Sequence, residues 1–320
     1  MFPKKSIYQQ LTETRYVLFA IACIWIFFRH TFYYNQYTYG IVLDSIIQIG
    51  DCGVDIFMFL SGYGLFFSYN KNPNLYNFYR KRIWRIIPII TILLITFSII
   101  EIILGNSITK YLTLSYWFYQ IYSNYWFIGA ILIFYATFPI IYNSTIKRPK
   151  STLLLSLIIG LSGITIIKIE NTGIYDQLVV YFARLPIFVL GCILGYKSKW
   201  LEKSRIFLGL FLIGIPILFI LPKDYQRLCY CITTVGIILI ISKISDILPK
   251  NVTNILKILG KASLEFYLIH IFILSNNILS IINKNISSQI ITTFICLILV
   301  SILAVLAHLF INTILKKVTI

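Results

Sequence analysis

Charged residues are scarce in this sequence, and acidic residues are the scarcest. Only 12% of its 320 residues are charged, which is about half the share of a typical soluble domain. Hydrophobic residues make up 58% of the chain, and its mean hydropathy is +0.84. A soluble fold of this length could not remove that much apolar surface from water, so the composition excludes an ordinary soluble protein.

Metal-ligand patterns are also lacking. The chain has six cysteines, most of them in apolar stretches and without metal-ligand spacing. Cys229 and Cys231 form a C-x-C that has no second pair to match it. We therefore expect no metal site, and we interpret the cysteines as apolar filler. The sequence also lacks a linker long enough to separate two folds.

Long apolar stretches fill nearly the whole chain. Each is close to the roughly 20 residues that cross a bilayer, and such a segment satisfies its own backbone in lipid only as a helix. The sequence thus predicts an all-α fold, a polytopic transmembrane helical bundle of about ten helices that forms a single domain over residues 1–320. The expected spans are 16–34, 53–69, 86–106, 125–143, 152–169, 177–196, 206–222, 228–245, 263–283 and 289–315.

Basic residues are distributed unequally between the connections. A net charge of +17 on a soluble protein would suggest nucleic acid, but here Lys and Arg cluster in alternate short connections, which the positive-inside rule explains better. We expect no nucleic-acid partner, a location in the cell membrane, cytoplasmic N- and C-termini and an even number of spans. The first apolar stretch is too long for a cleavable signal peptide, and we expect it to be a retained anchor.

Ionisable residues inside the apolar stretches are the main candidates for function, because lipid tolerates them poorly. His30 lies near the outer end of the first span, where a neutral imidazole could take a proton from a hydroxyl. A histidine at the headgroup level is an equal alternative. Asp55 lies one turn into the second span and could orient His30 or pair with Arg184. Alternatively, the span only packs against other helices, and Asp55 interacts favourably with the dipole at its N-terminus. Arg184 needs a buried partner or a water-filled cavity, and Asp55 is the obvious partner.

Several other residues have simpler interpretations. His308 in the last span has no evident partner, so packing is the default for it. Glu265 and His270 lie in the inner half of the ninth span. Three glycines of the second span would let neighbouring helices approach closely: Gly53, Gly62 and Gly64.

A basic cluster precedes the third span. Arg82 and Arg85 are three residues apart and therefore share a helix face, and two guanidinium groups suit phosphate. The simpler explanation is a cluster that obeys the positive-inside rule. Arg15 lies at the inner end of the first span, on the same predicted side of the membrane.

Four segments together resemble the integral-membrane acyltransferase-three family, whose members mostly O-acetylate cell-surface polysaccharides. They occur in the family's order and span nearly the whole chain: GVDIFMFLSG at 53–62, FYRKRIWRIIP at 78–88, RLPIFVLG at 184–191 and LGKASLEFYLIH at 259–270. Two positions depart from the family's pattern. Phe19 stands where the family has an Arg, one helical turn from Arg15, and Ile131 stands where a Glu is often found.

The resemblance implies a membrane O-acyltransferase. It would move an acyl group, acetyl by preference, from acyl-coenzyme A to a hydroxyl of a cell-surface or lipid-linked saccharide. Acetyl-coenzyme A would be a co-substrate, with no permanently bound cofactor, and membrane lipid would surround the chain. The resemblance leaves the oligomeric state open. It assigns catalysis to His30, Asp55 and Arg184, and binding of the coenzyme A phosphates to Arg15, Arg82 and Arg85.

Two other functions remain as alternatives. A transporter or flippase of a lipid-linked glycan would also have many helices and intramembrane charges, but it would need a continuous polar path. The ionisable residues here concentrate in two layers instead, which favours an enzyme. A non-catalytic member of the family is the third possibility, because the departures at Phe19 and Ile131 leave room for it.

Overall fold

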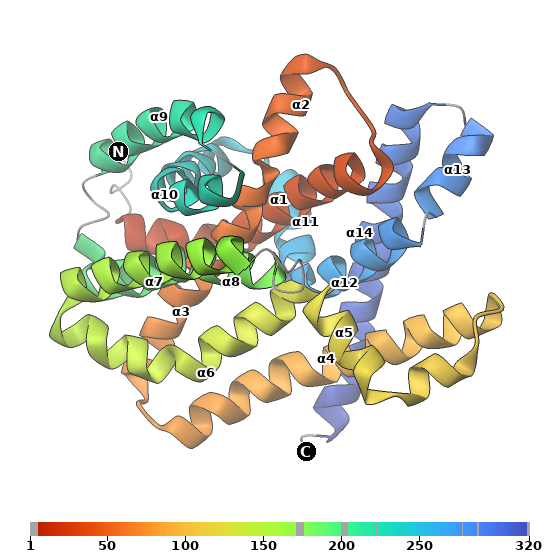
Figure 1. The fold of residues 1–320 in the computed structure, drawn as a ribbon, viewed down its shortest axis with the longest axis horizontal. Coiled ribbons are helices and arrows are strands. Elements are labelled where there is room, and N and C mark those ends of the chain that lie inside the picture. The colour runs from red at the N-terminus through yellow and green to blue at the C-terminus, as the bar shows by residue number, and fades with distance from the viewer. Residues whose placement is uncertain are drawn as a thin grey trace. The chain divides into compact units, whose positions relative to one another are not determined.

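The structure is a computed structural model that describes residues 6–170, 176–199, 204–221, 223–276, 278–286 and 288–318. This part of the chain is almost entirely helical and contains no strand (Figure 1). The expected all-α class is therefore confirmed. Helices are the only elements that a single apolar segment can form in lipid, because each satisfies its own backbone hydrogen bonds.

The helices follow one another with short connections. In chain order they are α1 (Ile7–Asn35), α2 (Ile41–Gln48), α3 (Cys52–Lys71), α4 (Leu75–Ile103), α5 (Leu114–Tyr122), α6 (Trp126–Lys147), α7 (Pro149–Glu170), α8 (Asp176–Tyr196), α9 (Ser204–Ile220), α10 (Lys223–Ile247), α11 (Lys250–Lys261), α12 (Ser263–Ser275), α13 (Ile278–Ile286) and α14 (Gln289–Val318). Two short 3-10 helices are η1 (Ile49–Asp51) and η2 (Ile108–Leu112).

The number of membrane spans is smaller than the ten expected. Within the described residues, seven helices are long and apolar enough to cross a membrane, and the bent pair of α11 and α12 could make an eighth. The seven are Ile7–Asn35, Leu75–Ile103, Trp126–Lys147, Pro149–Glu170, Leu178–Tyr196, Tyr225–Ile247 and Gln289–Lys316. A polytopic helical membrane protein is thus confirmed, and the count of about ten is corrected.

Three expected spans account for the difference. The segment 263–283 is broken, because α12 ends at Ser275 and α11 meets α12 at an angle of 74°. Helix α9 has only 17 residues, fewer than the roughly 20 of a straight crossing. Helix α3 has 20 residues but ends in the polar run 68–71, so its apolar part is shorter than a crossing.

The described chain divides into two compact units, each assembled from three separate segments. Unit 1 consists of Met1–Leu18, Val54–Arg80 and Trp126–Leu248, and unit 2 consists of Phe19–Gly53, Lys81–Tyr125 and Pro249–Ile320. The expectation of a single domain over the whole chain stays a prediction.

In unit 1, α3 and α8 run parallel to each other. Asp55 near the start of α3 contacts Arg184 in α8, and further along both helices Phe66 lies against Gly195. The residue numbers of the contacting positions therefore increase in the same direction along both helices, as in a parallel pair. Helices α7, α8 and α10 enclose a small apolar core of Ile164, Val179 and Ala183.

In unit 2, α12 is the most buried helix. Every side chain from Glu265 to Leu274 is buried, and α12 contacts α11, α13 and α14. Its Phe272 ring stacks on Phe97 of α4, with centroids 4.3 Å apart. The side chains that α12 carries are therefore held by neighbours on several sides.

Candidate active site

Asp55 and Arg184 form a buried ion pair in unit 1. Asp55 is 0% exposed and Arg184 is 1% exposed, and Nη2 of Arg184 lies 3.8 Å from Oδ2 of Asp55. The guanidinium also lies over the ring of Trp126, 5.4 Å from its centroid, as in a cation–π interaction. Removing either charge would leave the other buried and unpaired. The pairing expected from the sequence is present, and the catalytic roles of the two residues stay predictions.

Glycines let α3 and α8 approach closely about two helical turns from this pair. A Cβ atom at Gly62 would lie 2.2 Å from the carbonyl oxygen of Phe188, and one at Gly191 would lie 2.3 Å from that of Phe59. Both distances are far inside van der Waals contact, so no larger residue fits without moving backbone. The expected close approach at Gly62 is confirmed, and it sets the spacing between the two helices that carry the ion pair.

The three arginines expected to bind coenzyme A lie in different units. Arg15 belongs to unit 1, where its guanidinium lies against α3, 3.4 Å from the position that a Cβ on Gly64 would take. Arg82 and Arg85 belong to unit 2. On α4, Arg82 is half-buried and Arg85 is exposed. A joint role of the three toward coenzyme A stays a prediction.

His30 meets a second histidine in unit 2. Its Nδ1 lies 2.9 Å from Nε2 of His270 in α12. The two ring planes differ by only 14°, and the ring centroids are 5.1 Å apart. A ring nitrogen carries its proton or lone pair in the plane of the ring, so nearly coplanar rings that meet edge to edge suit a hydrogen bond. His270 is 1% exposed, whereas His30 is only half-buried.

The position of His270 is fixed from both sides. Its Nδ1 lies 2.9 Å from the carbonyl oxygen of Phe266, one helical turn earlier. The ring of Phe27, from the same helix as His30, packs edge-on against both Phe266 and His270, with centroids 6.3 Å apart in each case. Aromatic packing of this kind holds a ring in one orientation. The His30–His270 contact is therefore part of a packed interface between α1 and α12.

A buried carboxylate lies on α12 as well. Glu265 is 1% exposed, and its Oε1 lies 2.8 Å from Nδ1 of His308 in α14. Nε2 of His308 lies 3.0 Å from Nδ2 of Asn312. An amide nitrogen can only donate, so Nε2 is the acceptor and Nδ1 donates to the carboxylate. From the sequence His308 had no evident partner and packing was its default role, but the structure gives it Glu265 as a partner, because α12 and α14 pack side by side.

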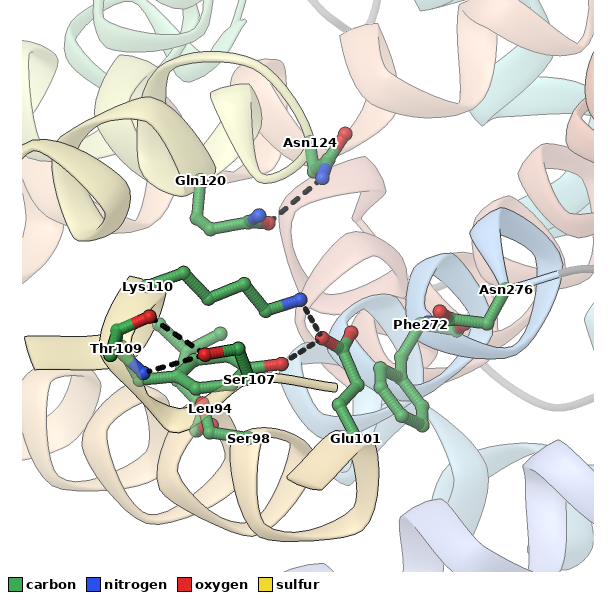
Figure 2. Close-up of polar contacts among 11 residues, drawn as sticks. Leu94, Ser98, Glu101, Ser107, Thr109, Lys110, Gln120, Asn124, Phe272 and Asn276 are labelled. Carbon is green, nitrogen blue, oxygen red and sulfur yellow. Dashed lines mark hydrogen bonds and ion pairs between the residues drawn. The ribbon is translucent and has the colours of Figure 1, made fainter. Parts of the chain in front are cut away.

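A further polar cluster fixes the connection after α4. Glu101 accepts a hydrogen bond from Nζ of Lys110 at 2.9 Å (Figure 2). It also accepts one from the hydroxyl of Tyr111. Burial and the bonded carboxylate raise the pKa of Tyr111. Burial alone would lower the pKa of Lys110, but its bonds with Tyr111 and Glu101 raise it overall. Nearby, Asn124 donates to Gln120 at 2.8 Å. We interpret the cluster as structural, because Glu101 is engaged in tying η2 to α4.

Sequence reasoning found some of these residues and missed a contact. His30, Asp55 and Arg184 were chosen because ionisable groups are rare in apolar helices. His270 carries the same signal and ends one of the segments that resemble the family, but its contact with His30 joins residues 240 positions apart. Its sequence position alone does not reveal that contact.

A comparison with protein families identifies the chain. A family model described as an acyltransferase domain, that of the acyltransferase-three family, matches residues 20–309. No curated protein and no solved structure matches the chain. Because the family model covers most of the sequence, the chain belongs to this family and is an acyltransferase.

Proposed function

We propose that this member of the acyltransferase-three family transfers an acyl group, acetyl by preference, from acyl-coenzyme A to a hydroxyl of a cell-surface or lipid-linked saccharide. Family membership supplies the reaction class. The observation that carries the assignment of a base is the hydrogen-bonded contact between His30 and His270 within apolar helices. A histidine that only anchored the helix at the headgroup level would not require a buried polar partner of this kind.

The reaction needs one proton to leave the acceptor and one to reach the donor's sulfur. The imidazole of His30 removes the proton of the acceptor hydroxyl. The oxygen attacks the thioester carbonyl, a C–O bond forms, and the C–S bond then breaks. The thiolate of coenzyme A leaves and recovers the proton from His30. The imidazole returns to its neutral state, and the products are an ester and free coenzyme A.

The charged residues support the two substrates in this scheme. The phosphates of coenzyme A bind Arg82 and Arg85, because guanidinium groups pair well with phosphate, and the family resemblance alone gives Arg15 the same role. Those residues lie on the basic side of the chain, which the positive-inside rule places in the cytoplasm, where acyl-coenzyme A is made. Asp55 and Arg184 pair with each other between α3 and α8, and the family resemblance alone gives them a part in catalysis. The saccharide approaches from the opposite side of the cell membrane.

Substitution of His30 tests the proposal. The purified protein in lipid vesicles is given isotopically labelled acetyl-coenzyme A and the surface saccharide fraction of the cells that produce it. His30→Gln keeps polarity and volume but cannot act as a base, so transfer of label should fall by about 100-fold or more. Tyr33→Phe, at an exposed neighbouring position, is the matched control and should keep full activity.

The results also separate the alternatives. Unchanged transfer by correctly inserted His30→Gln protein would remove His30 from the mechanism. Binding of coenzyme A by the normal protein without any transfer would favour a non-catalytic member of the family. Movement of a lipid-linked glycan across the vesicle membrane, with no binding of coenzyme A, would favour a flippase.

A further inference from the structure

Two hydrogen bonds in series determine where the protons of the two histidines lie. The carbonyl oxygen of Phe266 can only accept a hydrogen bond. Because Nδ1 of His270 lies 2.9 Å from it, that nitrogen must carry a proton. A neutral imidazole holds one proton, and neutral rings are favoured here because charge is costly inside the membrane. Nε2 of His270 is therefore an acceptor.

The same reasoning extends to His30. Nε2 of His270 lies 2.9 Å from Nδ1 of His30, and two acceptors would repel each other at this distance. Nδ1 of His30 must therefore donate, which leaves the lone pair on its Nε2. Within the described residues Nε2 of His30 has no hydrogen-bond partner, and the side chain is only half-buried. The nitrogen that can act as a base is thus the one that is not occupied.

We infer that His270 is a positioning residue that holds His30 in the Nδ1–H tautomer and thereby makes Nε2 of His30 the catalytic base. This inference rests on the proposed function and adds to it the identity of the basic nitrogen and of the group that selects it. From the sequence, orienting His30 was one of three roles considered for Asp55. In the structure Asp55 pairs with Arg184, and the Nδ1 position of His30 is taken by His270.

The arrangement also suits the charged state that forms during the reaction. When His30 accepts the proton of the hydroxyl, its Nδ1–H bond to His270 becomes charge-assisted and stronger. His270 remains neutral, and its own Nδ1–H stays bonded to the carbonyl of Phe266. A neutral imidazole as partner supports the transient cation without a permanent negative charge in an apolar helix.

Two variants of His270 separate this role from simple packing. The side-chain oxygen of Gln can reach the place of Nε2 and accept from His30, whereas the shorter Asn reaches only the place of Nδ1. We expect His270→Gln to retain most of the kcat and His270→Asn to lose about 100-fold or more. The KM for acetyl-coenzyme A should change little in either variant, because neither alters the proposed phosphate contacts.

The tautomer itself can be measured without turnover. The chain has three histidines, so ¹⁵N NMR of histidine-labelled protein in lipid gives few signals, which His30→Gln and His308→Gln assign. We expect the Nδ1–H form for His30 in the normal protein and the Nε2–H form in His270→Asn. An Nε2–H form of His30 in the normal protein would overturn the inference, and so would His270→Asn protein with normal kcat and an unchanged tautomer. If the normal protein transfers no acyl group, the proposed function is contradicted instead. The two failures can be distinguished, because the NMR measurement of the tautomer does not require acyl transfer.

Discussion

At the scale of single residues, the ionisable groups chosen from the sequence as catalytic candidates each lie beside another ionisable group. Asp55 lies beside Arg184, and His30 beside His270. Pairing of this kind is expected for packing alone, because unpaired polar groups are costly in lipid. What distinguishes His30 is its second nitrogen, which makes no hydrogen bond within the described part of the chain and is thus available to a substrate.

The sequence revealed which residues to consider but only some of their partners. Opposite charges at a similar expected depth were enough to pair Asp55 with Arg184. No such rule pairs two neutral histidines, and none pairs a carboxylate with a histidine on another helix. Those contacts depend on which helices are neighbours and how each is rotated, and a span pattern does not contain that information.

Removing the two arginines of α4 should weaken the use of the acyl donor. In Arg82→Ala/Arg85→Ala protein, two charge-assisted bonds to phosphate are lost, each typically about 1.5–3 kcal/mol. We therefore expect the KM for acetyl-coenzyme A to rise at least about tenfold. The change in kcat at saturating donor should be smaller. Initial rates over a range of donor concentrations measure both quantities.

A double variant with the same loss of charge provides the control. Lys147→Ala/Arg148→Ala removes two exposed basic residues at the end of α6, on the same expected side of the membrane. Its KM should stay normal. If both double variants behave alike, Arg82 and Arg85 serve only the orientation of the chain and do not bind the donor.

At the scale of helices, the contact between α3 and α8 depends on small residues. Gly62 and Gly191 bring the two backbones together, and the ion pair lies two helical turns away along the same interface. In membranes, helices associate largely through close packing of this kind. The sequence predicted the close approach at Gly62 from residue size, but it did not identify α8 as the partner.

One added methyl group tests this contact. In Gly62→Ala the new Cβ would meet the carbonyl oxygen of Phe188 at 2.2 Å, so backbone must shift, at a typical cost of about 1–3 kcal/mol. In Gly209→Ala the new atom has nothing within 4 Å, and the higher helix propensity of Ala should keep or raise stability. Thermal unfolding in detergent should therefore show a lower Tm only for Gly62→Ala. Equal Tm values would contradict the close packing.

The broken segment around α12 shows what an apolar pattern cannot predict. Hydropathy suggested one span over 263–283, but α12 is a short buried helix that ends at Ser275. The side chain of Asn276 donates to the carbonyl oxygen of Phe272 at 2.9 Å and so satisfies a carbonyl at the end of the helix. An Asn within an apolar segment indicates a possible end of a helix. A prediction from hydropathy alone missed this end, because one polar residue hardly changes the mean hydropathy of the segment.

At the scale of the whole molecule, the sequence predicted the fold class correctly but overestimated the number of membrane spans. The long apolar segments and the unequal distribution of basic residues predicted a polytopic helical membrane protein. Both signals are sums over many residues, so they do not depend on any single contact. The number of spans was too high, because a bend or a short helix depends on local contacts. The resemblance of four ordered segments predicted the family correctly, because it did not depend on the span count.

The most direct test of the account is mass spectrometry of the surface saccharides of living cells. The saccharides are compared between cells that lack the protein, cells that produce it and cells that produce His30→Gln at the same level in the membrane. The account predicts acyl esters, mainly acetyl, only where the unaltered protein is present. Identical esterification in all three, or esterification that persists with His30→Gln, would contradict it.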